Sequence, residues 1–157
     1  MQFQPMDSRS YFMLPQAPED AGYYVYGRLK GIPSKGASQY AYPSLMTAIL
    51  RVEREWSHID DRKFGIGDIS LAGGIDHPDH GSHESGLDVD LRPIRKDGQH
   101  KPVSWHDNEY DFEATAKLIE LFHAYANVKV LYFNDARIPF VVRWPHHDDH
   151  FHVTVWG

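Results

Sequence analysis

The sequence contains no cysteine. Disulfide bonds are therefore excluded, and so is any metal site built on thiolates. Histidine, aspartate and glutamate remain as the strong metal ligands. With 157 residues, the chain is long enough to bury the core of one domain without covalent cross-links.

Long apolar runs and clusters of positive charge are missing as well. No stretch approaches the roughly 20 apolar residues of a membrane-spanning helix, so we expect no membrane partner. Residues 1–22 have neither the basic start nor the apolar middle of a secretion signal. We therefore expect delivery by a phage lysis system or a secretion machine, or a sequence that has been trimmed. The formal net charge of -6, without any Lys/Arg block, argues against a nucleic-acid partner.

The order of the predicted elements indicates a small α+β fold with a largely antiparallel sheet. We expect an irregular leader over residues 1–22 and a single domain over residues 23–157. Apolar residues three or four apart predict helices, and runs of β-branched and aromatic residues predict strands. The predicted helices are residues 43–56 and 112–126, with Asp111 as the N-cap of the second, and the predicted strands are 23–29, 68–72, 87–91, 128–133 and 151–156.

Histidine is concentrated in two parts of the chain. The sequence has 11 histidines, and seven of them fall into two groups that also contain acidic residues. Isolated histidines, such as His58 and His100, are expected to be solvated and without function. The first group, in a predicted loop, is His77, His80 and His83, and the second is His146, His147, His150 and His152.

Strand alternation explains the spacing within the second group. His150 and His152 are two residues apart in a segment with strand character. Side chains at this spacing project from the same face of a strand. Both imidazoles can therefore face one site, while Phe151 and Val153 face the core.

The first group leads to a strand with the same alternation. Asp88 and Asp90 share one face, and His83 precedes them by a short loop. If the two strands are neighbours, His83, Asp90 and His152 converge on a single metal ion. Three N/O ligands and one open position are typical of catalytic zinc. For Asp88 two roles remain open, orienting a ligand or capping the loop.

These residues resemble a known family. The runs GDIS at residues 67–70, GG at 73–74 and HGSHESGLDVD at 80–90 resemble the penicillin-insensitive murein endopeptidases. The run HDDHFHV at residues 147–153 is similar to their second motif. That family shares a metal-site superfamily with the D-Ala-D-Ala metallopeptidases, the lysostaphin-type peptidases and the hedgehog N-terminal domain. The resemblance covers roughly residues 40–157.

The resemblance implies a four-stranded, mainly antiparallel sheet that is flanked by helices and carries one zinc ion. It places His83, Asp90 and His152 at the ligand positions. His150 falls at the position of a histidine that stabilises the tetrahedral transition state.

The resemblance also implies further functional residues, namely His80 and His147, which match histidines typical of the endopeptidases. Asp149 matches the acidic general base of the carboxypeptidase branch. Either His147 or Asp149 therefore serves as the general base that takes a proton from water, and both remain candidates.

Hydrolysis of a peptide bond in peptidoglycan, in the periplasm or outside the cell, is the function that the resemblance implies. Two alternatives remain: a D,D-carboxypeptidase or dipeptidase acting on free stem peptides, and a non-catalytic, zinc-stabilised module that binds the cell wall. The oligomeric state is not specified by the sequence.

Overall fold

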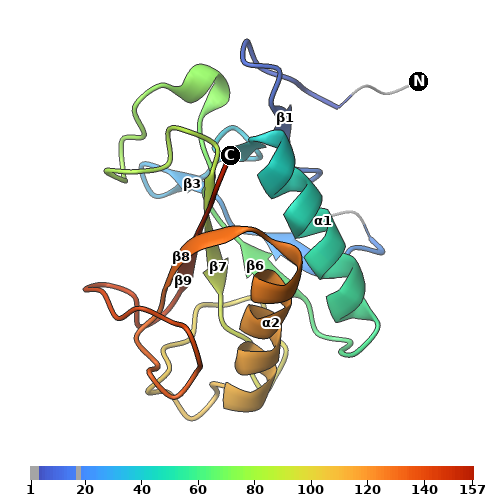
Figure 1. Cartoon of the computed structure of the whole chain (residues 1–157), viewed down its shortest axis with the longest axis vertical. Helices are drawn as coiled ribbons and strands as arrows, with labels where there is room; N and C mark the ends of the chain where they lie inside the picture. Colours follow the sequence, from blue (N-terminus) through green and yellow to red (C-terminus); the bar gives the residue numbers. More distant parts are fainter. Residues whose placement is uncertain (1–3, 17–18) are drawn as a thin grey trace.

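The computed structural model describes residues 4–16 and 19–157, and its centre is a five-stranded mixed sheet (Figure 1). The first pair, β2 and β6, is parallel and the other pairs are antiparallel. The expectation of a four-stranded, mainly antiparallel sheet is therefore wrong in strand number, since the sheet has five strands, and three of its four pairings are antiparallel. The strands, in spatial order, are β2 (Tyr23–Val25), β6 (Phe64–Ile66), β7 (Asp88–Arg92), β9 (Phe151–Val155) and β8 (Val128–Tyr132).

The parallel pair follows from the connection between its two strands. The chain leaves β2, passes through helix α1 (Pro43–Ser57) and then enters β6. A crossover that contains a helix brings the chain back to the edge where β2 began, so the second strand runs in the same direction as the first.

Two helices cover one face of the sheet, and both lie where the sequence predicts them. Helix α1 buries a stripe that includes Leu45, Ile49 and Val52. Helix α2 (Phe112–Tyr125) begins at Asp111, whose carboxylate accepts a hydrogen bond of 3.0 Å from the backbone N–H of Ala114. This contact caps the first turn of the helix. The two helices pack side by side (Figure 1).

The strand predicted at residues 68–72 is wrong. The ladder is formed four residues earlier, by β6, and the chain then runs beside the sheet without pairing as a strand. Here the N–H of Ile69 donates to the carbonyl of Ser38 at 2.7 Å, and the N–H of Asp90 donates to the carbonyl of Asp68 at 3.1 Å. A single-turn 3-10 helix, η1 (Ala72–Gly74), follows. The predicted strand at 23–29 is also divided, into β2 and β3 (Arg28–Leu29).

Strands β7 and β9 separate the core from the polar face by strict alternation. Val89, Leu91, Phe151 and Val153 are all fully buried and belong to the core cluster under the helices. The residues between them point to the opposite face. The predicted assignment of faces is therefore confirmed for both strands, and it places the acidic residues and His152 away from the helices.

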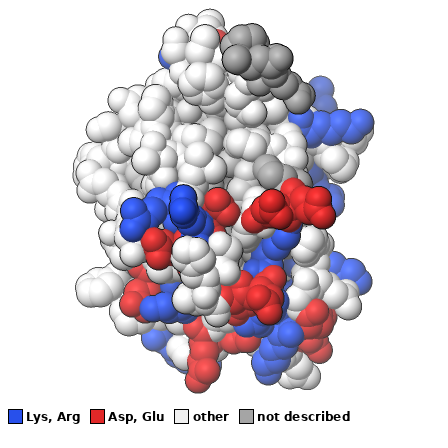
Figure 2. Space-filling view, turned by 90° about the vertical axis from the view of Figure 1, so that its right-hand side faces the viewer, with Lys and Arg blue, Asp and Glu red and all other residues white. Residues whose placement is uncertain are grey.

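Short pairs of strands complete the fold. β1 (Phe12–Met13) pairs with β5 (Tyr40–Ala41), and β3 pairs with β4 (Ile32–Pro33). Within the described residues, neither helix has the length and apolar character to cross a membrane. On the side seen in Figure 2, acidic and basic side chains are interleaved over the lower half.

Candidate metal centre

His83 enters the site from the loop between η1 and β7. Its side chain is only 1% exposed, and its backbone has a positive φ of 66°. Nδ1 lies 2.9 Å from the carbonyl oxygen of Ile69, so this nitrogen carries the proton and donates. Nε2 then has a free lone pair, and it lies 3.2 Å from Oδ2 of Asp90.

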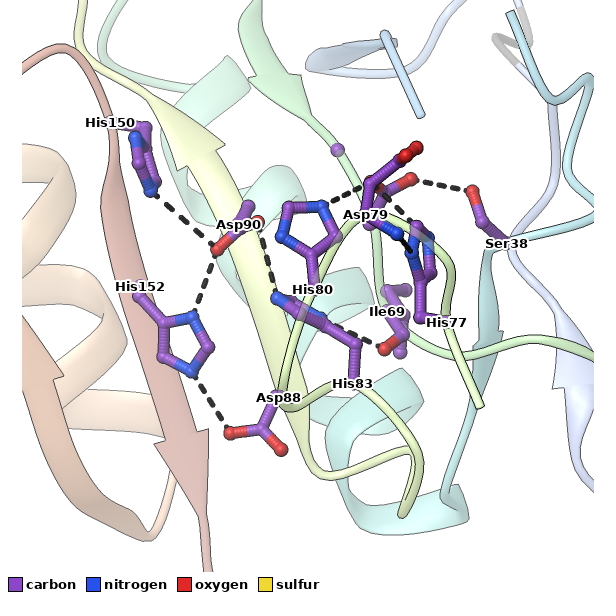
Figure 3. A network of polar contacts seen from close by, with 12 residues as sticks. Ser38, Ile69, His77, Asp79, His80, His83, Asp88, Asp90, His150 and His152 are labelled. Atoms are coloured by element: carbon purple, nitrogen blue, oxygen red, sulfur yellow. Dashed lines mark hydrogen bonds and ion pairs between the residues drawn. The ribbon is translucent and has the colours of Figure 1, made fainter. Parts of the chain in front are cut away.

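His152 reaches the same carboxylate from the neighbouring strand. Asp90 and His152 are directly paired in the β7–β9 ladder. Nδ1 of His152 lies 2.9 Å from Oδ1 of Asp90, and Nε2 lies 2.9 Å from Oδ1 of Asp88. Figure 3 shows Asp90 between the two imidazoles. The register of two strands thus assembles residues that are far apart in sequence.

When His83 and His152 are both neutral, they have too few N–H groups to donate to every oxygen atom that they contact. A neutral imidazole carries one N–H. If His152 donates to Asp88, its Nδ1 presents a lone pair to Asp90, just as Nε2 of His83 does. Donor atoms around a tetrahedral zinc ion are separated by about 3.3 Å, close to the distances measured here. Imidazole nitrogen and carboxylate oxygen are ligand types that zinc binds in proteins.

The pKa values of His152 and Asp90 also indicate that the site favours a positive charge. Burial acts to lower the pKa of His152, but the hydrogen bonds to Asp88 and Asp90 outweigh it and raise this pKa to about 9. Burial acts to raise the pKa of Asp90, but the bonds to His152 and His83 hold it well below its usual range. A bound cation would supply the charge that the carboxylates otherwise draw from protons.

His80 lies on the other side of His83. Donor atoms of His80, His83 and Asp90 all lie within 4.8 Å of one another, so these three residues form one group able to hold a metal ion. Nε2 of His80 also lies 2.8 Å from Oδ2 of Asp68. The predicted set, with His152 in place of His80, is not among the groups of described residues whose donor atoms all lie within 4.8 Å of one another.

His150 and Asp149 form a pair at the edge of the site. Nδ1 of His150 lies 2.9 Å from Oδ1 of Asp149, and Nε2 lies 4.0 Å from Oδ1 of Asp90. The hydrogen bond from His150 lowers the pKa of Asp149, whose side chain is 58% exposed. Asp149 is thus engaged with the neighbouring imidazole.

His147 has a different environment. Its Nδ1 lies 2.9 Å from the carbonyl oxygen of Pro145 and donates to it, which leaves Nε2 as an acceptor. Burial lowers the pKa of His147, so the ring is neutral at pH 7. Its ring centroid lies 4.8 Å from that of His150 and 6.1 Å from that of His152. A neutral imidazole beside the candidate ligands is suited to accept a proton.

Asp68 is a buried residue of the site for which the sequence pattern predicts no role. One carboxylate oxygen accepts from Ser38 Oγ at 2.6 Å and from the N–H of Arg28 at 2.9 Å, and the other contacts His80. His77 packs beside it, with Nδ1 accepting from the N–H of Asp79 at 3.1 Å. Asp68 falls within the GDIS run, but a contact with a loop 12 residues later has no signature in local spacing.

Two adjoining cavities extend along β7 on both sides of Asp90. One of about 700 Å³ includes Asp88, Tyr132 and Trp144 in its lining, and the other, of about 470 Å³, includes Arg92. Both are also lined by Asp90 and by three further shared residues, Asp79, His80 and His150. The candidate metal centre therefore lies at the middle of an open groove.

A histidine–carboxylate centre in such a groove is typical of metal-dependent hydrolases. Residues 28–138 match the family model described as penicillin-insensitive murein endopeptidase, and the chain belongs to this family. The matched part includes His83 and Asp90 but ends before His147. His152 lies outside the matched part and is paired with Asp90 in the β7–β9 ladder. No curated protein matches the chain. Membership of the family identifies a peptidase that acts on the cell wall.

Proposed function

We propose that the protein is a zinc-dependent endopeptidase that hydrolyses peptide bonds in the cross-links or stem peptides of peptidoglycan. The observation that carries this proposal is the Asp90 carboxylate, which lies 2.9 Å from Nδ1 of His152 and 3.2 Å from Nε2 of His83. One ion, held by His83, Asp90 and His152, would satisfy all three.

Bound zinc supplies Lewis acidity, which activates water and polarises the scissile carbonyl. His147 is the favoured general base, because its Nδ1–H is fixed on Pro145 and its Nε2 is free to accept the proton of the attacking water. The same nitrogen can then pass that proton to the leaving amine. Asp149 is less suited to this role because it already accepts a hydrogen bond from His150.

The His150–Asp149 pair is suited to stabilise negative charge. In its protonated form, His150 keeps Nδ1–H on Asp149 and presents Nε2–H to the centre. A donor fixed in this way would bind the carbonyl oxygen as it becomes an oxyanion, a contribution of about 3–4 kcal/mol by analogy with oxyanion-hole donors.

The groove favours an endopeptidase over a carboxypeptidase. Cavities continue past Asp90 in both directions along β7, so a peptide can occupy the site on both sides of the scissile bond. An enzyme that removes terminal residues needs an open groove on one side only.

The test is mass spectrometry of muropeptides from purified sacculi before and after digestion. We expect cross-linked dimers to be lost, and we expect a strong chelator to abolish this and added zinc to restore it. Trimming of free stem peptides alone would indicate a carboxypeptidase. Binding of zinc and sacculi without release of fragments would indicate a binding module. Hydrolysis that survives complete chelation would rule out the metal.

Three variants test the ligand assignment directly. His152→Ala should lose stoichiometric zinc and activity, as should His83→Ala. His80→Ala, in which the three proposed ligands remain, should keep most of its zinc. If His80→Ala loses zinc and His152→Ala retains it, the ion is held by His80, His83 and Asp90 instead.

A further inference from the structure

Arg92 lies on the polar face of β7, one step beyond the candidate metal centre. Alternation places Asp88, Asp90 and Arg92 on the same face of the strand. Two residues along a strand correspond to about 6.6 Å. This is about the distance between a scissile peptide bond and a group on the adjacent residue of an extended substrate.

Among the residues that the structure describes, the guanidinium of Arg92 has no carboxylate partner. Within residues 4–16 and 19–157, no Asp or Glu oxygen lies within 4.0 Å of it. Five other arginines form such ion pairs, namely Arg9, Arg51, Arg62, Arg95 and Arg137. An unpaired, half-buried cation beside a catalytic groove is available to bind a substrate anion.

The position of Arg92 is fixed by aromatic packing. Its guanidinium carbon lies 3.9 Å from the centroid of the Tyr26 ring and 5.9 Å from that of Tyr24. Tyr26 in turn lies against Gly67, where an added Cβ would come within 2.6 Å of the ring. The cation–π contact orients the arginine without neutralising its charge.

The cavity beside Arg92 is suited to a small anionic group. It has a volume of about 470 Å³, and Arg28, which also lacks a carboxylate partner among the described residues, contributes to its lining. Four acidic residues also line the cavity, and each has another partner: Asp90 contacts His83 and His152, Asp149 contacts His150, Asp68 contacts His80, and Asp79 accepts from the N–H of Lys30. Among the described residues, neither guanidinium lies within 4.0 Å of a carboxylate oxygen, so each can pair with a carboxylate of a ligand.

We propose that Arg92, assisted by Arg28, binds a free carboxylate of the substrate on the residue next to the scissile bond. This inference rests on the proposed peptidase function and specifies its substrate as an acidic peptide. The carboxylate has two sources, the C-terminus of a stem peptide or the second carboxylate of a diamino acid in the chain.

Equilibrium binding tests the proposal without depending on turnover. The probes are synthetic stem tetrapeptides that end in D-alanine, as the free acid, as the C-terminal amide, and with the diamino-acid carboxylate amidated. The zinc-loaded wild-type protein should bind the free acid about 10–100-fold more tightly than one of the two amides, as expected for a charge-assisted hydrogen bond. The amide that binds weakly identifies the source of the carboxylate.

Arg92→Gln should abolish this preference and leave the affinity for that amide unchanged, and Arg92→Lys should restore part of it. Arg95→Gln is the matched control, because Arg95 is paired with Asp97 and does not line the cavity. Circular dichroism and thermal unfolding verify that each variant is folded. In turnover, Arg92→Gln should raise KM for the free acid with little change in kcat.

Two outcomes would overturn the proposal. One is equal binding of the acid and both amides by the wild-type protein. The other is a preference for the acid that persists in Arg92→Gln. An equal loss of binding for the acid and the amides in Arg92→Gln would also contradict the proposal, because Arg92 would then only balance the charge of its neighbours. Failure of the wild-type protein to digest sacculi would contradict the proposed function, while the binding measurement would still decide the role of Arg92.

Discussion

Asp88 contacts His152 on the ring nitrogen that faces away from Asp90, and a proton held on that nitrogen would leave Nδ1 free for the proposed metal. Carboxylates in this position typically affect metal affinity by 10–100-fold. We therefore expect Asp88→Ala to weaken zinc binding by about that factor, measured by competition with a chromogenic chelator.

Asp61→Ala is the control for that measurement, because Asp61 is exposed and distant in sequence from the site. Unchanged zinc affinity in Asp88→Ala would contradict the orienting role. It would leave Asp88 with the second role considered for it, capping the loop through its 3.5 Å contact with Ser85.

The hydrogen bonds of His147 and Asp149 distinguish these two candidates for the general base. Removal of a general base typically costs 10²–10⁴-fold in rate, so we expect a loss of about that size in kcat for His147→Ala and a smaller one for Asp149→Ala. Burial lowers the pKa of His147 below its usual 6.5. The base is active when deprotonated, so wild-type kcat should be retained down to pH 6.5 and fall below it.

That pH profile requires zinc content to be measured at every pH, because protons also compete with the metal for imidazole. Full kcat in His147→Ala together with a large loss of kcat in Asp149→Ala would identify Asp149 as the general base instead.

The sequence identifies site residues only where their spacing is local. Alternation in two strands is enough to predict that Asp90 and His152 face the same side. Asp68 and Tyr26 could not be found in this way, because their positions in the site depend on how the loops and strand β2 pack against the rest of the sheet. Arg92 had a local signal, its position two residues after Asp90, but only the structure reveals that it lacks a carboxylate partner among the described residues.

At the scale of elements, β9 anchors the site through its buried face. Phe151 is fully buried, with its ring centroid 6.1 Å from those of Phe122 and Phe133. Truncation of a buried phenylalanine costs about 3–5 kcal/mol, so Phe151→Ala should lower the free energy of unfolding by about that amount, measured with urea.

Phe140→Ala is the matched control, because the Phe140 side chain is 84% exposed. We expect its free energy of unfolding to change by at most about 0.5 kcal/mol. Equal effects of the two substitutions would contradict the packing described for β9.

The helices were predictable as elements, and part of the sheet was not. Periodicity over 14 or 15 residues and a capping aspartate define α1 and α2 in the sequence. β6 has only three residues, with a glycine at its centre, and therefore lacks a pattern. The apolar run after it resembles a strand but runs beside the sheet without pairing as a strand. Parallel pairing of β2 depends on a long crossover, which local sequence does not encode.

For the whole molecule, the proposed zinc ion links the loop before β7 to the C-terminal strand. A ligand that binds only the folded state stabilises it by about 4.1 kcal/mol at 1,000 times its dissociation constant. For a chain of this size we expect zinc at that excess to raise Tm by about 8–16 °C. Thermal unfolding of the chelated protein with added zinc measures the effect.

His83→Ala should lose this increase in Tm. Calcium is the control ion, because it prefers oxygen ligands and should have little effect. An equal increase with calcium, or an increase that persists in His83→Ala, would place the stabilising ion elsewhere.

The uninterrupted β7–β9 ladder also determines where the gene can tolerate insertions and deletions. At the sheet edge, the β8–β9 pairing contains an irregularity between Val128 and Val130, so a change of register is already accommodated there. Between Asp88 and Leu91 the pairing with β9 has no such break. One residue added between Phe151 and His152 would place both side chains on the same face, so that either the imidazole would face the core or Phe151 would face the groove. Length variation should therefore accumulate in β8 and the loops, and be excluded from the few residues that bring Asp90 and His152 together.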